Sequence, residues 1–269
     1  MKDLSGKVAV ITGGASGIGL GFAERFGAAG MKLVIADIEQ QALDDAESQL
    51  RDAGHEVLGV RTDVASAAEV DDLAAAAIAE YGPIHVVCNN AGVVVRHRPW
   101  GSLEDWEWVL GVDLWGVIHG VRAFVPHMLD HGEPAYVVNT ASTAGLIGFP
   151  TIASYNVAKH GVVALSETMH HELTGTNVGV SVLCPGVVDT NIATSERNRP
   201  GVDSDTTFGD GGLNTAAETL TPAQVADIVV DAMAAERFWI LPHPRYAQTA
   251  VQNAMSIVNG TDPVLPTVE

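Results

Sequence analysis

The sequence of 269 residues contains little cysteine and few basic residues. Its two cysteines, Cys88 and Cys184, stand at the ends of apolar runs typical of strands, which favours buried thiols over a disulfide. Neither has a His or Lys beside it in the sequence, so neither is expected to act as a nucleophile. Fourteen Lys and Arg residues stand against 33 Asp and Glu residues, giving a net charge of −19. Such a charge repels phosphate backbones and anionic lipid, which argues against nucleic acid and membrane surfaces as partners.

A long uninterrupted apolar segment is also missing. No run of about 18 uncharged apolar residues occurs, so no membrane span is expected. Residues 1–7 contain no apolar stretch of the kind found in secretory signals, and we expect a cytoplasmic protein. The hydrophobic content of 47% suffices for a sizeable core. Because α/β folds of this length commonly form one unit, we predict a single domain over residues 1–269.

Apolar runs rich in β-branched residues alternate with helical stretches along the chain. The runs predict strands at 7–11, 32–36, 57–61, 84–88, 135–139, 178–183 and 238–241. Helices are expected at about 17–29, 39–53, 67–80, 103–130, 154–173 and 222–235, with a bend or break at Pro126. Near-continuous hydrophobicity is typical of strands that are buried on both faces. The sequence therefore predicts an α/β fold, a doubly wound parallel sheet (Rossmann fold) with helices on both faces.

Two segments depart from this alternation. Residues 186–220 are rich in Thr, Asn, Asp and Gly, and we interpret them as a long mobile substrate loop, because such loops are often lids. The C-terminal tail, residues 242–269, either completes the pocket of a neighbouring subunit or is partly disordered. No metal is predicted: a calcium loop at 203–210 lacks the required glycine, and His127 and His131 have helical ligand spacing without a third ligand.

A glycine-rich loop follows the first predicted strand and opens the first predicted helix. Glycines there let the backbone turn tightly and approach a pyrophosphate, whose charge is stabilised by amides at the helix N-terminus. The loop residues expected to hold a dinucleotide are Gly13, Ser16, Gly17, Ile18 and Gly19. For the loop alone, a glycine turn without function is nearly as good an interpretation.

An acidic residue ends the second predicted strand. Asp37 stands eighteen residues after Gly19, close to where an acid accepts both ribose hydroxyls of NAD. A 2′-phosphate would meet like charge there, and Ser16, Ile38 and Glu39 offer no neighbouring Arg or Lys to receive it. The pattern favours NAD over NADP, with Asp37 and Ile38 on the ribose side. A solvated Asp at a strand end is the weaker alternative.

Tyr155 and Lys159 lie four residues apart on one predicted helix, and Tyr155 follows Ser142 by thirteen residues. A phenol has an ordinary pKa of about 10, so its use near neutral pH needs a cation close by. A spacing of four places both side chains on one helix face. For this pair alone, an ordinary Tyr and a solvated Lys would be the better interpretation. Together with Ser142 and the glycine loop, a catalytic pair is favoured.

In order and spacing, these motifs resemble those of the short-chain dehydrogenase/reductase family. They are TGGASGIG at 12–19, Asp63-Val64, NNAG at 89–92, Ser142, Tyr155-x-x-x-Lys159 and Pro185-Gly186. The likeness covers residues 7–190 and continues more weakly to about residue 241. It implies an NAD-dependent oxidoreductase.

The resemblance also implies roles for individual residues. Asp63 and Val64 would hold the adenine, Asn90, Ala91 and Gly92 would lie beside the cofactor, and the cofactor-binding residues near the nicotinamide would be Pro185, Gly186, Val188 and Thr190. Ser142 would bind the substrate oxygen and Tyr155 would exchange its proton. Lys159 would bind the nicotinamide ribose and lower the pKa of the phenol. Local turn chemistry is the alternative for the Asp and Asn residues.

One position departs from the family pattern. Asp113 stands where the family usually has Asn, whose main-chain carbonyl holds a water in a relay to the Lys. A main-chain role survives this change, but a carboxylate near Lys159 would favour the ammonium and partly offset its effect on Tyr155. With Asp113 counted among the catalytic residues, we predict an active enzyme with a more alkaline optimum than an Asn variant.

The residues expected to border the substrate are mostly apolar: Val94, Leu146, Phe149 and Ile192, together with Ser142. They favour a hydrophobic secondary alcohol or its ketone. The predicted function is therefore that of an NAD-dependent secondary-alcohol dehydrogenase. A carbonyl reductase acting mainly in the reductive direction is one alternative. A catalytically weak NAD-binding regulatory or scaffold subunit is another, supported by Asp113 alone.

Self-association is expected as well. The predicted helices 103–130 and 154–173 carry apolar side chains round much of their circumference, more than one sheet contact can cover. The family resemblance supplies the second burial partner as a homodimer or homotetramer.

Overall fold

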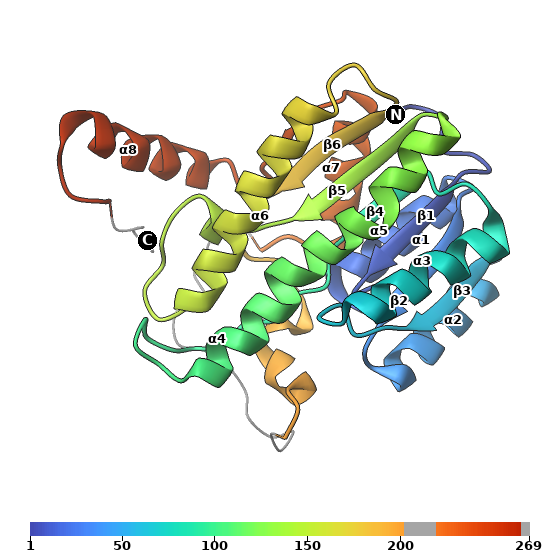
Figure 1. Cartoon of the computed structure of the whole chain (residues 1–269), viewed down its shortest axis with the longest axis horizontal. Coiled ribbons are helices and arrows are strands. Elements are labelled where there is room, and N and C mark those ends of the chain that lie inside the picture. Colours follow the sequence, from blue (N-terminus) through green and yellow to red (C-terminus); the bar gives the residue numbers. More distant parts are fainter. Residues whose placement is uncertain (202–218, 265–269) are drawn as a thin grey trace.

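The computed structural model describes residues 1–201 and 219–264. Seven strands form one sheet (Figure 1): β1 Val8–Thr12, β2 Lys32–Asp37, β3 Val57–Arg61, β4 Val86–Asn89, β5 Ala135–Thr140, β6 Val178–Leu183 and β7 Trp239–Ile240. Their order is β3-β2-β1-β4-β5-β6-β7, and every neighbouring pair is parallel. The predicted doubly wound sheet is confirmed, and each predicted strand lies within two residues of the observed one.

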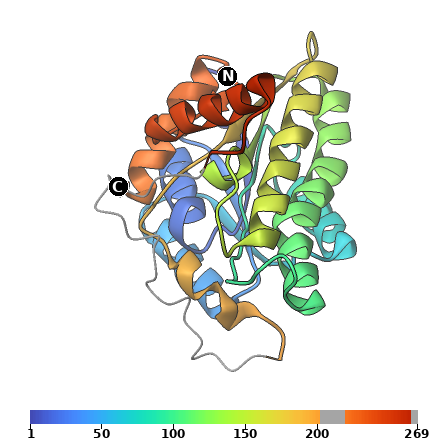
Figure 2. The same ribbon diagram turned by 90° about the vertical axis from the view of Figure 1, so that its left-hand side faces the viewer.

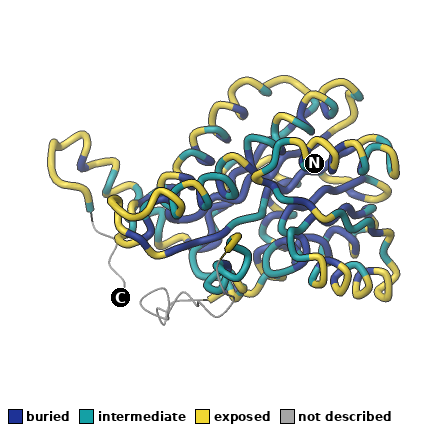
Figure 3. The backbone as a smooth tube through the Cα atoms, turned by 60° about the horizontal axis from the view of Figure 1, so that its bottom comes forward, coloured by how far each residue is buried: buried dark blue, intermediate teal, exposed yellow. Residues whose placement is uncertain are grey.

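Helices cover both faces of the sheet (Figures 1 and 2). One face carries α1 Gly17–Ala28, α2 Gln40–Asp52 and α7 Pro222–Ala234, whose buried side chains include Phe22, Leu43 and Val229. The other carries α3 Ala67–Tyr81, α5 Gly116–His131 and α6 Ala153–Glu172, with Leu73, Phe124 and Met169. Figure 3 shows the strands buried between helices whose outer sides are exposed. Burial on both faces explains why the strands are continuous apolar runs.

The helical stretch 103–131 contains an irregular turn, but not where the sequence predicts it. Helix α4, Leu103–Leu110, leads into a π-helical turn, η1, at Gly111–Trp115, and α5 then runs through Pro126 without a break. The prediction of a bend or break at Pro126 is wrong as regards a break, because Phe124, Val125 and Met128 are buried around it and hold the helix in place. By length and composition this stretch could cross a membrane; here it packs against α3, α6 and β4 as a core helix.

The substrate segment and the tail are only partly as expected. Residues 191–198 form a 3₁₀ helix, η3, so a plain loop is the wrong description there. The Thr190 hydroxyl accepts a hydrogen bond from the Ile192 amide at the start of η3, and Val188 and Leu220 form a backbone bridge. Residues 203–210, considered above for calcium, lie outside the described residues. In the tail, α8 Arg245–Asn259 extends from the side of the sheet near α6 (Figure 1).

Strand order reverses where β1 lies between β2 and β4. In open α/β sheets, ligands bind outside the carboxyl ends of the strands at such a point. The motifs found in the sequence follow these strand ends, so the topology brings them to one edge.

Candidate active site

A cavity of about 690 Å³ opens at this edge of the sheet. Most of the residues predicted for the site line it: Gly13, Ser16, Gly17, Ile18, Asp37, Ile38, Asp63, Val64, Asn90, Ala91, Gly92, Val94, Ser142, Phe149, Tyr155, Lys159, Pro185, Gly186, Val188, Thr190 and Ile192. Gly19, Asp113 and Leu146 do not line it. The fold therefore gathers residues from nearly the whole chain around one space.

The glycine loop is shaped for a close approach to an anion. Gly13 and Gly17 have φ angles of +62° and +51°, a region that L side chains rarely adopt. A Cβ on Gly19 would overlap the Gly13 carbonyl oxygen, so only glycine lets the backbone of the loop pass this closely. The Ser16 side chain makes no capping hydrogen bond and the first turn of α1 holds no acidic residue. The amides at this helix end are thus suited to a pyrophosphate.

Asp37 ends β2 with a carboxylate held in place by backbone amides. Its oxygens accept hydrogen bonds from the Ala15 and Glu39 amides, both at 3.2 Å. Burial raises the pKa of Asp37, and the backbone hydrogen bonds act against this. A carboxylate has further acceptor capacity, so Asp37 can still receive ribose hydroxyls from the cavity.

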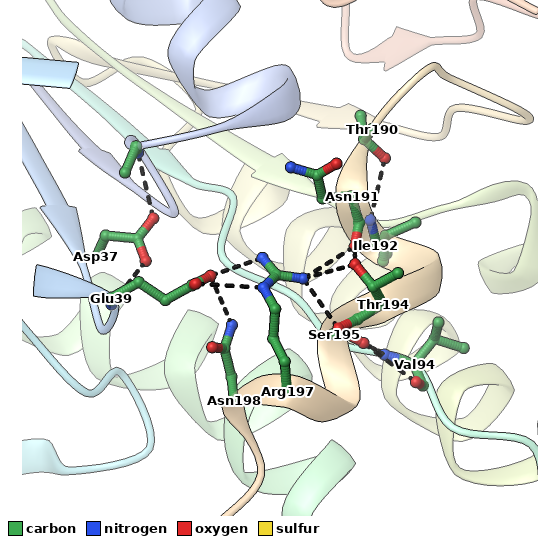
Figure 4. A network of polar contacts seen from close by, with 11 residues as sticks. Asp37, Glu39, Val94, Thr190, Asn191, Ile192, Thr194, Ser195, Arg197 and Asn198 are labelled. Atoms are coloured by element: carbon green, nitrogen blue, oxygen red, sulfur yellow. Dashed lines mark hydrogen bonds and ion pairs between the residues drawn. The ribbon is translucent and has the colours of Figure 1, made fainter. Parts of the chain in front are cut away.

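The structure corrects one part of the reasoning about this end of the cavity. No Arg or Lys neighbours Asp37 in the sequence, but Arg197 of η3 reaches the same region and binds Glu39, with Arg197 Nη2 2.6 Å from Glu39 Oε1 (Figure 4). Although burial opposes it, hydrogen bonds from Arg197 and Asn198 lower the pKa of Glu39. Sequence reasoning missed Arg197 because it lies 158 residues from Glu39.

Ser142, Tyr155 and Lys159 meet at the other end of the cavity. The Ser142 hydroxyl follows β5 and accepts a hydrogen bond from the Ala144 amide at 3.1 Å. Lys159 Nζ lies 5.4 Å from the centre of the Tyr155 ring and donates to the Thr140 carbonyl at 3.1 Å. Burial raises the pKa of Tyr155, whereas Lys159 and a hydrogen bond with Ser142 lower it. The phenol therefore has both a neighbouring cation and a hydroxyl partner.

Asp113 lies directly behind Lys159, in the π-helical turn. Its Oδ2 is 3.1 Å from Lys159 Nζ, and its Oδ1 accepts a hydrogen bond from the Val93 amide at 2.7 Å. The residue is fully buried. Although burial of Lys159 acts in the opposite direction, the Asp113 carboxylate raises the pKa of Lys159 and keeps it an ammonium. The same carboxylate raises the pKa of Tyr155. Asp113 thus acts on the phenol through charge, although it does not border the cavity.

The third part of the cavity wall is apolar. Val94, Phe149 and Ile192 lie here as predicted, but Leu146 packs instead against the core cluster that contains Val117 and Val162. Leu146 was misplaced because the short 3₁₀ helix after Ser142, η2 at Thr143–Gly145, turns the chain back toward the core.

Several lining residues have no signal in the sequence. They include Trp108, Ile152 and Tyr246. Tyr246 belongs to the tail, which therefore contributes to the cavity of its own chain; its ring lies 6.3 Å from that of Phe149. The His243 ring accepts a hydrogen bond from the Gly186 amide at 2.9 Å and fixes the start of this segment. No spacing rule places a tail residue beside a loop almost a hundred residues earlier.

The other groups considered in the sequence serve packing. His127 and His131 hydrogen-bond to the backbone of Ile84. In residues 1–201 and 219–264 there is no group of three or more His, Cys, Asp or Glu side chains suited to a metal. Both cysteines are free and buried, as predicted, and burial raises the pKa of Cys184 to about 12.

Comparison with known proteins agrees with this geometry. The family model for short chain dehydrogenases matches residues 7–201. A CLA biosynthesis dehydrogenase/reductase of Lactiplantibacillus plantarum is 35% identical over 91% of both chains. A 1-deoxy-11-beta-hydroxypentalenate dehydrogenase of Streptomyces avermitilis is 38% identical over 88% of this chain and 84% of the relative.

Among solved structures, a short chain dehydrogenase/reductase from Burkholderia phymatum in complex with NAD superposes with a TM-score of 0.91, at 42% identity and with 99% of each chain covered. Its cofactor is the one for which the Asp37 carboxylate and the α1 N-terminus are suited. The chain belongs to the short-chain dehydrogenase/reductase family and is an oxidoreductase that uses NAD.

Proposed function

We propose that the protein interconverts a hydrophobic secondary alcohol and its ketone, with Tyr155 as the acid and base. The observation that supports this most directly is a partly buried phenol at the cavity wall, with Lys159 Nζ 5.4 Å from its ring and Ser142 as its hydrogen-bonding partner. When bound, the cofactor would accept the hydride in oxidation and donate it in reduction. The protein contributes position, charge and a proton-transfer group.

The chain's own residues divide this work. In oxidation, the Tyr155 oxygen takes the hydroxyl proton of the alcohol; in reduction, it returns that proton to the carbonyl oxygen. The Ser142 hydroxyl donates a hydrogen bond to the substrate oxygen and fixes its approach. Lys159 stabilises the phenolate, which accepts the proton in the oxidative direction and forms in the reductive direction. For the cofactor, Asp37 would hold the adenosine ribose, the amides of α1 the pyrophosphate, and Lys159 the nicotinamide ribose.

The substrate class follows from the apolar wall. Val94, Phe149, Ile152, Ile192 and Tyr246 line the cavity beside Ser142 and Tyr155. Such a wall gains free energy by taking apolar surface out of water. A relative whose name is that of a hydroxypentalenate dehydrogenase supports this class of hydroxylated, carbon-rich substrate.

The direct test is an assay of NADH absorbance with a panel of alicyclic, terpenoid and steroid-like alcohols and ketones. Tyr155→Phe removes only the proton-transfer group and is expected to lower kcat by about a hundredfold or more. Tyr81→Phe is the matched control, because Tyr81 lies at the end of α3, outside the cavity. Equal activity of Tyr155→Phe and the wild type would disprove the assigned role. NAD binding without turnover across the panel would favour a regulatory or scaffold subunit.

A second candidate is a carbonyl reductase that works mainly in the reductive direction. Asp113 favours it, because its carboxylate raises the pKa of Tyr155 and so keeps the phenol protonated as an acid. The dependence of kcat on pH for reduction of a matched ketone tests this preference. Reduction that stays fast to a higher pH than in an Asp113→Asn variant supports the reductase.

The protein is also proposed to form a homodimer or homotetramer. Trp115 and Val157 are 53% and 49% exposed, on η1 and α6, which contact each other. Large apolar side chains left on adjoining segments favour burial against a second copy.

A further inference from the structure

Two charged residues from distant parts of the chain meet beside the end of β2. Glu39 lies two residues after Asp37, and Arg197 lies in η3. Arg197 Nε donates to Glu39 Oε2 at 3.2 Å and Nη2 donates to Oε1 at 2.6 Å, which makes the pair bidentate. Asn198 donates to the same Oε1 at 2.9 Å. Bidentate Arg–carboxylate pairs are among the stronger and more directional hydrogen-bonded contacts.

The rest of the Arg197 guanidinium is held by η3 itself. Its Nη1 donates to the Asn191 carbonyl at 3.2 Å and to the carbonyl and hydroxyl of Thr194, both at 2.9 Å. Figure 4 shows the guanidinium between Glu39 and η3, on the side of the Asp37 carboxylate. The cation is therefore fixed in place, and its two remaining nitrogens are occupied by Glu39.

The charges at this end of the cavity are unequal. Asp37, Glu39 and Arg197 all line it. Within the described part of the chain, the basic residues that line the cavity are Arg197 and Lys159, and Lys159 is paired with Asp113 at the opposite end. Asp37, Glu39 and Arg197 together carry one net negative charge beside the place where Asp37 would hold the adenosine ribose, and Asp63, which also lines the cavity, adds to it. A phosphate there would add close to two more negative charges at pH 7.

We propose that the Glu39–Arg197 pair is a second determinant of cofactor choice, in which Glu39 withholds from the ribose a cation that would otherwise receive a 2′-phosphate. Asp37 rejects the phosphate by like charge. Glu39 rejects it by occupying the guanidinium fork, the group best shaped for a phosphate in this region. The inference rests on the proposed placement of the adenosine ribose at Asp37.

The test is a binding measurement that needs no turnover. Isothermal titration calorimetry with 5′-AMP and 2′,5′-ADP gives the ratio of their affinities in the full-length protein. Glu39→Gln removes a negative charge and frees the fork, so the ratio should shift toward 2′,5′-ADP by about tenfold. Arg197→Met leaves Glu39 without a neighbouring cation and more repulsive toward a phosphate, so the ratio should shift the opposite way. In the double variant Glu39→Gln/Arg197→Met, the shift toward 2′,5′-ADP produced by Glu39→Gln alone should be lost.

The two single variants should change the affinity ratio in opposite directions, which a merely structural pair would not do. If Glu39 and Arg197 only tied η3 to the sheet, both single variants would change the affinity for the two nucleotides alike. Asp105→Asn is the matched control: Asp105 pairs with Arg199 Nη1 at 2.6 Å, just beyond η3, and does not line the cavity. Its ratio should equal that of the wild type. An unchanged ratio in Glu39→Gln, or a gain that persists in the double variant, would overturn the proposal.

The nucleotide-binding results can be interpreted independently of the enzyme assay. Loss of turnover on the alcohol panel would refute the proposed reaction but leave the nucleotide ratios interpretable. Failure of both nucleotides to compete with NADH for the wild-type protein would instead refute the placement of the ribose at Asp37, and the inference with it.

Discussion

At the scale of single residues, the feature with the largest consequence for the proposed chemistry is the carboxylate of Asp113. It lies 3.1 Å from Lys159 Nζ in a fully buried position. A buried ion pair gains less than its Coulomb attraction suggests, because both charges lose their hydration. Its consequence for function is therefore best sought in proton transfer: the pair stabilises the ammonium and weakens the pull of that ammonium on Tyr155.

Asp113→Asn tests this with a shift of known sign. In the proposed reaction, oxidation needs the phenolate, so its rate is expected to rise with pH through the pKa of Tyr155. Because Asp113 raises that pKa, its removal should move the rising limb to lower pH. Asn can still accept the hydrogen bond of the Val93 amide, so the π-helical turn should persist. The measurement is kcat against pH, with Asp130→Asn on the exposed end of α5 as the control. Superimposable profiles for wild type and Asp113→Asn would exclude a side-chain role.

At the scale of elements, a histidine couples the edge of the sheet to pH. His85 precedes β4, and its Nδ1 accepts a hydrogen bond from the Val8 amide of β1 at 3.1 Å. Its Nε2 faces Glu133 at 3.1 Å, and Lys7 and His131 lie on the same cluster. Burial lowers the pKa of His85, with Glu133 opposing, so the folded protein favours the neutral ring.

The sign of the pH effect follows from that shift. Below the ordinary pKa of about 6.5, His85 takes up a proton in the unfolded chain but resists it in the folded chain. The free energy of unfolding should therefore decrease as the pH is lowered. In His85→Asn, the side-chain oxygen can keep the bond to Val8 but does not titrate, so the fall between pH 7.5 and pH 5.5 should be smaller. Urea unfolding at both values measures it, with exposed His171→Asn as the control. The same loss in His85→Asn as in the wild type would contradict this account.

The helices and strands also show which parts of the fold can be predicted from the sequence. All seven strands and the Tyr155–Lys159 helix could be predicted, because apolar runs and a spacing of four are local signals. The turn at Gly111–Trp115 and the 3₁₀ helix at Asn191–Asn198 could not, since each depends on contacts made by distant residues. Ser195 illustrates this: its hydroxyl accepts from the Val94 amide at 2.9 Å and donates to the Val94 carbonyl at 3.2 Å, across 101 residues.

The candidate site divides in the same way. Glycines, Asp37, Ser142, Tyr155 and Lys159 could be placed, because the strand ends that carry them converge in any doubly wound sheet. Arg197 and Tyr246 could not be placed, because they come from segments whose path is set by tertiary contacts. Leu146 was misplaced for the same reason: periodicity says nothing about a short 3₁₀ turn after a strand.

At the scale of the whole molecule, charge and apolar surface act against each other. A net charge of −19 makes two copies repel, and this repulsion is reduced by salt. The exposed Trp115 and Val157 favour contact between copies. Association should therefore strengthen as the ionic strength rises, as long as the apolar face lies in the interface.

Val157→Glu places a carboxylate at the centre of this proposed interface. Burying that charge without a partner is unfavourable, and the variant should dissociate at concentrations about tenfold higher than the wild type. Sedimentation velocity across a concentration series measures the change. Gln41→Glu adds the same charge on the exposed side of α2, over the other face of the sheet, and should leave association unaltered. If both variants weaken association equally, net charge governs it; if neither does, the copies meet through a different surface, because a glutamate at the centre of an apolar contact cannot be neutral.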